Sequence, residues 1–203
     1  MEFWHDIITE RSWKILQDIK REFDFILIGG WAVYLWTKAF KSKDVDILID
    51  IKNLDYLKNN FDLRKNENLK KYEIKKDGID IDVYVAFYSK LIIPVEDLVK
   101  YTTKIESFKV VKKEALLILK QGSEKEREFS EKGLKDRIDI ITLLLNDIDF
   151  KEYYKLVEKY KLDDFPSRLK IIINNFKDLK YINLNPREFK LKKQEILKIE
   201  KEA

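Results

Sequence analysis

The chain of 203 residues contains no cysteine, and it contains a single histidine, His5. The absence of cysteine excludes disulfide bonds, zinc-thiolate sites and thiol nucleophiles. With one histidine, acid–base or zinc chemistry centred on histidine has little support, and we expect His5 on the surface of a helix.

Long apolar runs are also missing. The longest, such as Ile140 to Leu145, are far too short to cross a bilayer. The first residues lack the basic start and apolar run that are typical of a signal peptide. We therefore expect a soluble, cytoplasmic protein without a membrane partner.

Neither sign of charge dominates, since 41 basic residues nearly balance 37 acidic ones and the net charge is +4. This balance excludes the sharply basic signature of a protein dedicated to wrapping DNA. The phosphate-binding P-loop, the Gly-x-Gly-x-x-Gly dinucleotide motif and the Gly-x-Ser-x-Gly nucleophile motif are all absent. The chain therefore belongs to none of the enzyme classes that these motifs mark.

Periodicity predicts a mixed first half and a helical second half. In the first half we expect alternating helices and strands, with an Asp77-Gly78 hairpin turn. The expected elements are helices over 3–22, 31–40 and 54–60 and strands over 25–28, 45–51, 70–76 and 79–87. From Pro94 onward the expected elements are helices over 95–101, 113–120, 124–146, 150–160, 165–176 and 190–202. We therefore expect a core of residues 1–94 and a helical region of residues 95–203 packed on it.

A paired glycine followed by two alternating aspartates is the most informative pattern in the chain. Gly29 and Gly30 begin an expected helix, and the strand that follows carries Asp44 and Asp46. Alternate residues of a strand project to the same face, so both carboxylates share one face and the aliphatic residues lie mostly on the other. Neighbouring carboxylates repel each other unless a cation neutralises them. The pattern therefore predicts a divalent ion, and Mg²⁺ best suits oxygen ligands.

A third carboxylate is expected from the strand over 79–87, where Asp80 and Asp82 share a face. A sheet that places this strand beside the first would bring one of them close to Asp44 and Asp46. Three converging carboxylates can hold two Mg²⁺ ions about 4 Å apart, as in enzymes that displace groups at phosphorus. The glycine pair suits the same site, because backbone N–H groups at a helix start can approach phosphate oxygens.

Together these residues resemble the nucleotidyltransferase-fold superfamily, also called the polymerase-beta-like family. Its pattern is a hydrophobic residue, Gly-Gly or Gly-Ser, a helix, Asp-x-Asp on a strand, and a third acid on a later strand. The matching segments here are Ile28-Gly29-Gly30, Asp44-Val45-Asp46 and Asp82. Asp82 is preferred to Asp80, although that choice stays open, because the third acid of the family usually lies between hydrophobic residues. The resemblance implies that Asp44, Asp46 and Asp82 ligate the metal and carry the catalysis, and that Gly29 and Gly30 cradle a triphosphate.

A narrower resemblance is to the AbiEii-type members. Lys41-Ser42-Lys43 replaces the arginine and threonine of their Arg-x-Thr-x-Asp-x-Asp form, and lysine lacks the bidentate fork of arginine. Residues 115–120 and 133–139 resemble their Leu-rich helix, Lys, and Lys-Asp-x-x-Asp pattern. Over residues 24–145, the resemblance implies further nucleotide-binding residues: Ser42, Lys120, Lys135, Asp136 and Asp139.

Simpler explanations stay open for each of these residues. Asp44 and Asp46 could form a solvated strand face, and Asp80 or Asp82 could be an exposed hairpin residue. The glycines could serve only a tight turn. Lys120 and Lys135 could be solvated helix positions. The acidic residues of the second segment could form local salt bridges with neighbours on their own helix, namely Asp136 and Asp139 with Lys132, Lys135 or Arg137.

The sequence therefore predicts an α/β (α+β) protein with a nucleotidyltransferase-type mixed sheet flanked by helices, followed by a helical C-terminal region. The implied reaction is Mg²⁺-dependent transfer of a nucleoside monophosphate from a nucleoside triphosphate to a hydroxyl of RNA, a protein or a small molecule. Two alternatives remain. One is a catalytically silent module that binds a nucleotide or a partner, and the other is the toxin of a toxin–antitoxin pair, with tRNA or a protein as acceptor and an antitoxin as partner.

Overall fold

The computed structural model describes residues 6–203, so His5 and the first residues of the helix expected over 3–22 lie outside the described part. The chain forms two compact units, one ending at Lys112 and the other beginning at Lys113. No helix within residues 6–203 combines the length and the apolar character needed to span a membrane.

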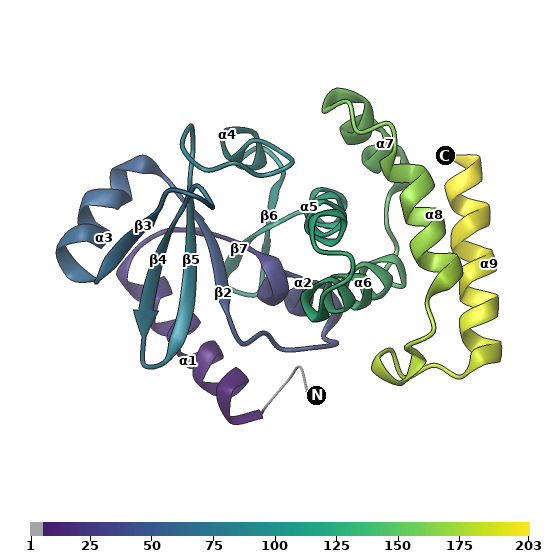
Figure 1. The fold of residues 1–203 in the computed structure, drawn as a ribbon, viewed down its shortest axis with the longest axis horizontal. Coiled ribbons are helices and arrows are strands. Elements are labelled where there is room, and N and C mark those ends of the chain that lie inside the picture. The colour runs from purple at the N-terminus through teal and green to yellow at the C-terminus, as the bar shows by residue number, and fades with distance from the viewer. Residues whose placement is uncertain (1–5) are drawn as a thin grey trace. The chain divides into compact units, whose positions relative to one another are not determined.

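The first unit is built on one sheet of seven strands in the order β3-β4-β5-β2-β1-β7-β6 (Figure 1). Neighbouring strands pair antiparallel except for β2 with β5 and β1 with β7, which are parallel. The sheet is therefore mixed, as the sequence predicted. The strand bounds are β1 Ile26–Ile28, β2 Val45–Ile49, β3 Leu63–Asn66, β4 Lys71–Lys76, β5 Ile79–Val85, β6 Thr102–Ile105 and β7 Phe108–Val111.

The centre of this sheet is apolar because its middle strands are short runs of Ile, Leu and Val. All three residues of β1 are buried, and so are four of the five residues of β2. The exception in β2 is Asp46, which is half-buried. Asp46 is thus a charged residue in a strand that otherwise belongs to the core. This position indicates a role other than packing.

Among the described residues of the first unit there are one 3-10 helix, over Ile51–Asn53, and four α-helices. Their bounds are α1 Asp6–Glu22, α2 Gly29–Thr37, α3 Leu54–Asn60 and α4 Val95–Leu98. The indole N–H of the fully buried Trp31 on α2 donates to Ser12 Oγ on α1 at 2.8 Å. The ring of Trp31 also lies 4.9 Å from that of Trp13, which in turn lies 5.5 Å from Phe108 of β7. Aromatic contacts and one buried hydrogen bond therefore fix α1 and α2 against each other.

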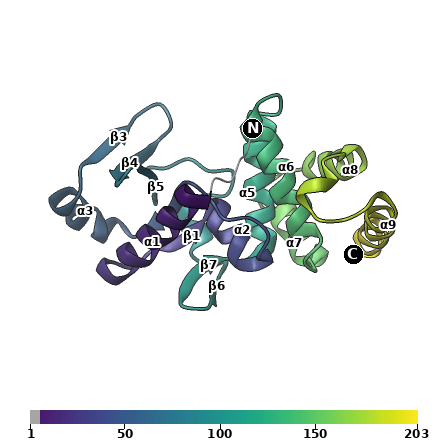
Figure 2. The ribbon, with the colours of Figure 1, turned by 90° about the horizontal axis from the view of Figure 1, so that it is seen from below.

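The second unit is helical. Its α-helices are α5 Lys113–Glu126, α6 Glu131–Leu144, α7 Phe150–Lys159, α8 Phe165–Asn175 and α9 Pro186–Glu202 (Figures 1 and 2). Gln121 of α5 is fully buried, and its amide group is satisfied on both sides. It donates to the carbonyl oxygen of Phe165 at 2.9 Å and accepts from the hydroxyl of Tyr153 at 2.9 Å. This polar bridge fixes α5 against α7 and the start of α8.

The structure corrects two expectations about the second half. The first unit extends past residue 94 to Lys112, because β6 and β7 add two strands to the sheet where only helices were expected. The helix expected over 113–120 continues to Glu126 as α5, and the helix expected over 124–146 begins only at Glu131 as α6. Ser130 is the N-cap of α6, because its Oγ accepts a hydrogen bond from Gly133 N at 3.0 Å. A Cβ on Gly133 would lie 2.2 Å from the carbonyl oxygen of Arg127, so the close turn requires glycine.

Candidate active site

Strand register places three carboxylates in a row across the sheet. Asp46 of β2 is paired with Asp82 of β5, and Asp82 is paired on its other side with Glu73 of β4. Directly paired residues project to the same face of a sheet, with neighbouring strands about 4.8 Å apart. We call Asp46, Asp82 and Glu73 the carboxylate row.

The register also separates the two aspartates of β5. The pairing of β2 with β5 begins at Val45 and Ile81, so Asp80 lies before it. The side chain of Asp80 is 59% exposed and lies 3.5 Å from Lys75 Nζ, whereas the side chain of Asp82 is 22% exposed. Asp82 is therefore the aspartate of β5 that lies beside Asp46.

Asp44 precedes β2 and is half-buried. Within residues 6–203, no three His, Cys, Asp or Glu side chains lie close enough to form a metal cage as they stand. The structure thus brings Asp46 and Asp82 together, but it does not draw Asp44 into a three-carboxylate cluster with them.

A lysine that sequence reasoning missed lies within the carboxylate row. Lys71 Nζ is 2.5 Å from Asp82 Oδ2 and 3.3 Å from Glu73 Oε1, and its side chain is only 12% exposed. Glu73 is also held by Asn66, whose side-chain amide donates to Glu73 Oε1 at 2.9 Å. The alternation of Lys71 and Glu73 in the strand expected over 70–76 put both on one face. Only the pairing of β4 with β5 shows that this face also carries Asp82.

Burial and neighbouring charges shift the pKa values of the residues in and beside the row. Burial and the nearby charge of Asp46 raise the pKa of Asp82 to about 6, against the opposing effect of Lys71. The pKa of Glu73 is lowered, first by the hydrogen bond from Asn66 and then by Lys71. Burial lowers the pKa of Lys71, but its contacts with Asp82 and Glu73 outweigh burial, so that its pKa is raised. A cation bound by Asp46 and Asp82 would therefore relieve the repulsion by which Asp46 raises the pKa of Asp82.

Gly29 brings the start of α2 against this site. Its φ of +64° lies in the left-handed region, and a Cβ built on it would lie 2.0 Å from Asp46 Oδ2. Only glycine fits both the conformation and the space. Gly30 is buried in the first turn of α2, and the residue before the helix, Ile28, provides no side-chain cap. The N–H groups of this first turn have no partner within the helix, as at every helix start, and they are suited to bind an anion.

The segment between α2 and β2 carries Lys41 and Ser42 of the expected motif. Lys41 is paired with Glu10 of α1, and this hydrogen bond raises the pKa of the lysine. Ser42 is buried, with 2% of its surface exposed. A role for Lys41 as a phosphate clamp would require it to leave Glu10.

In the helical unit, Lys120, Asp136 and Asp139 form a buried ionic cluster. Lys120 Nζ lies 2.7 Å from Asp139 Oδ2 and 3.4 Å from Asp136 Oδ1. The contact with Asp139 is an ion pair that lacks the geometry of a hydrogen bond. Arg127 Nε lies 2.6 Å from the other oxygen of Asp136. Lys135 is half-buried on α6. The two aspartates thus bind Lys120 and Arg127, and Lys120 is held within the helical unit.

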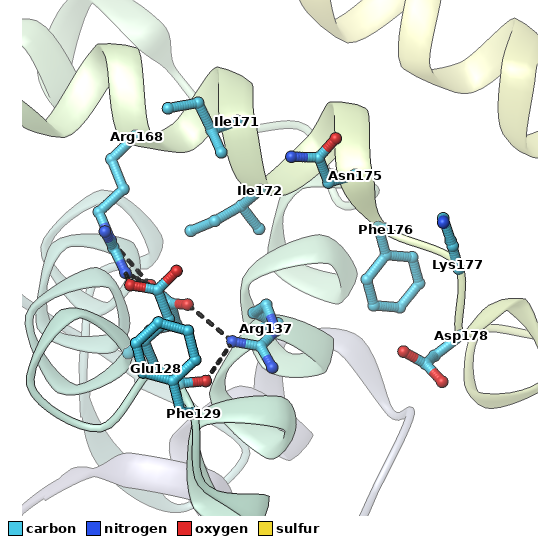
Figure 3. A pocket seen from close by; sticks show the side chains of 11 residues that line it. Glu128, Phe129, Arg137, Arg168, Ile171, Ile172, Asn175, Phe176, Lys177 and Asp178 are labelled. Carbon is cyan, nitrogen blue, oxygen red and sulfur yellow. Dashed lines mark hydrogen bonds and ion pairs between the residues drawn. The ribbon is translucent and has the colours of Figure 1, made fainter.

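A cavity of about 350 Å³ also lies in the helical unit (Figure 3). Glu124, which is 1% exposed, binds Arg137 at 2.9 Å and Arg168 at 2.7 Å, and Arg168 also binds Glu128 at 3.0 Å. The side chain of Phe129 on the rim is 99% exposed. The lining has three acidic residues, Glu124, Glu128 and Asp178, and three basic residues, Arg137, Arg168 and Lys177. Its formal net charge is therefore zero and would not attract a triphosphate.

Comparison with solved structures supports the fold. A candidate nucleotidyltransferase from H. pylori matches 97% of this chain and 95% of its own, with a TM-score of 0.51 and 15% sequence identity. The fold is nucleotidyltransferase-like. An antigenic nucleotidyltransferase-like protein from Paracoccidioides brasiliensis covers 83% of this chain and 94% of its own, with a TM-score of 0.41 and 18% identity. No family model matches the sequence, and no curated protein matches it.

At these identities the nucleotidyltransferase-like fold is what the comparison establishes. It agrees with the mixed sheet predicted from the sequence. The chemistry must be argued from the residues of this chain, and above all from Asp46, Asp82 and Gly29.

Proposed function

We propose that the chain is a Mg²⁺-dependent nucleotidyltransferase that moves a nucleoside monophosphate from a nucleoside triphosphate to a hydroxyl acceptor and releases pyrophosphate. The observation that supports it best is the pairing of Asp46 with Asp82 on parallel strands, directly against the glycine that begins α2. Carboxylates and free N–H groups placed side by side are the parts needed to bind a metal–triphosphate complex.

The donor set fits a hard divalent ion. Asp46 and Asp82 offer only oxygen atoms, and burial together with the charge of Asp46 raises the pKa of Asp82 to about 6 despite the contact with Lys71. In this proposal Asp44, from the segment before β2, is the third carboxylate. We expect two ions because three carboxylates can hold a pair of Mg²⁺ ions. When bound, such an ion neutralises charge on the phosphates and makes an attacking hydroxyl more acidic.

The residues of the chain perform the remaining steps. Gly29 and Gly30 let the backbone N–H groups of the first turn of α2 approach the triphosphate. Asp82 aligns the acceptor hydroxyl beside the phosphorus atom, and Ser42 assists from the segment before β2. Lys120, with Asp136 and Asp139, is already engaged in the helical unit, so this proposal relies on the sheet unit alone. The acceptor (tRNA, a protein or a small molecule), the AbiEii-type subclass and a toxin role follow from the sequence resemblance only.

The test uses the purified protein, Mg²⁺, each of the four triphosphates labelled at the α-phosphate, and tRNA or total protein as acceptor. We expect label to move to an acceptor with the wild type, and Asp82→Asn to abolish this transfer. Asp80→Asn is the matched control, because it removes a carboxylate from the same strand and face but at an exposed position. Transfer that survives in Asp46→Asn and Asp82→Asn would contradict the proposed mechanism.

A catalytically silent nucleotide-binding module is the second candidate, and one observation favours it. Lys71 already binds Asp82, and no three-carboxylate cluster stands ready among residues 6–203. A silent module would bind a non-hydrolysable triphosphate in a manner sensitive to Asp46→Asn, while no acceptor becomes labelled under any condition of the transfer assay.

A further inference from the structure

Lys71 is placed where a cation would be expected in a carboxylate site. Its ammonium group lies between Asp82 and Glu73, at 2.5 Å and 3.3 Å from their nearest oxygens. It comes from β4, the strand next to Asp82, and its side chain is 12% exposed. The lysine is therefore enclosed by the row and not extended into solvent.

We propose that Lys71 is a built-in counter-ion of the carboxylate row, which competes with a divalent cation for Asp82 and so sets the affinity of the site for metal. This inference rests on the proposed function, because it requires that Asp46 and Asp82 bind a metal ion.

Charge explains why an internal cation is present. The row holds three carboxylates within the width of three strands, and Lys71 offers one positive charge to Asp82 and Glu73. Without Lys71, the carboxylates would repel one another in a partly desolvated position. The lysine therefore stabilises the sheet while no metal is bound.

The same contact opposes the binding of a metal ion to Asp82. Mg²⁺ accepts oxygen ligands at about 2.1 Å in strict octahedral geometry, and it tolerates no ammonium group within its first shell. A metal ion bound to Asp82 would lie close to the ammonium group that is 2.5 Å from Asp82 Oδ2, and the two cations would repel each other. Glu73 offers the lysine a second partner, since it already lies 3.3 Å away and is itself anchored by Asn66. Lys71 thus passes from Asp82 to Glu73 when a metal ion binds.

Two substitutions should shift metal affinity in opposite directions. Lys71→Met removes the competitor and keeps the length of the side chain, so affinity should rise by about tenfold, the effect of one neighbouring charge on a carboxylate. Glu73→Gln removes the alternative partner, which leaves Lys71 on Asp82 and should weaken metal binding. Lys75→Met is the matched control, because Lys75 lies on the same strand and face but is 75% exposed and pairs with Asp80.

The measurement is titration of each full-length variant with Mn²⁺ alone, followed by electron paramagnetic resonance, with circular dichroism to show that each variant is folded. We expect tighter binding for Lys71→Met, weaker binding for Glu73→Gln and an unchanged affinity for Lys75→Met. Equal or weaker binding by a folded Lys71→Met would overturn the role of Lys71 while leaving the proposed function intact. Absence of Mn²⁺ binding from the wild type and all variants would overturn both.

Discussion

Ionisation of Asp82 in the folded chain costs free energy, and the size of this cost can be predicted. Its pKa is raised from 3.8 to about 6 in the folded chain, first by burial and then by Asp46. A carboxyl whose pKa is raised by folding binds its proton more tightly in the folded state, so its ionisation opposes folding. Well below pH 3.8 the group is protonated in both states and the penalty is absent. The penalty grows through the interval from 3.8 to about 6 and is complete above it. From the difference in pKa, it amounts to roughly 3 kcal/mol.

Asp82→Asn tests this reasoning, because asparagine has nearly the shape of a protonated aspartate and cannot ionise. We expect the variant and the wild type to have similar free energies of unfolding at pH 4. At pH 7 the variant should be more stable by up to about 3 kcal/mol. Comparison at each pH cancels the contribution of the titrating groups that do not interact with Asp82.

The assay is urea unfolding followed by tryptophan fluorescence at half-unit steps from pH 4 to pH 8. All four tryptophans precede residue 38, so their emission reports on the sheet unit that contains Asp82. A difference between the two proteins that does not vary with pH would refute the reasoning. A variant that loses stability as pH rises would also refute it, because the contact with Lys71 would then outweigh burial and repulsion.

Three further changes test the packing around these residues. Gly29→Ala should cost roughly 2 kcal/mol or more in thermal or urea unfolding, because alanine must adopt a positive φ and collide with Asp46; unchanged stability would show that the turn relaxes freely. Lys120→Met should cost about 3 kcal/mol, since it leaves Asp139 buried with its charge uncompensated, and adding Asp139→Asn should recover part of the loss. Ser130→Ala should cost about 1 kcal/mol through loss of the helix cap, whereas Ser130→Asp should retain it.

Periodicity was sufficient to predict the central elements of the sheet unit. The strands around Ile26–Ile28, Val45–Ile49 and Lys71–Lys76 are apolar or alternating, and each lies within or close to its predicted range. Three short strands were missed. Leu63–Asn66 and Thr102–Ile105 are polar edge strands of four residues, and such segments carry too few buried positions for a period to be visible.

The candidate site could be predicted only in part, for a related reason. A period of two shows that Asp80 and Asp82 share a face, but it cannot show which of them lies beside Asp46. That depends on the register between β2 and β5, which is set by long-range packing. Lys71 and Glu73 were not predicted as site residues for the same reason. Only the pairing of β4 with β5 places them beside Asp82.

The order of the strands has a consequence for solubility. The sheet ends in β3 on one side and β6 on the other, and each leaves one row of backbone groups without a neighbouring strand among the described residues. Exposed cationic side chains lie on both strands, Arg64 and Lys65 on β3 and Lys104 on β6. An approaching strand of another molecule would have to strip water from these charges before it could pair. We therefore expect neither border of the sheet to act as a template for edge-to-edge aggregation.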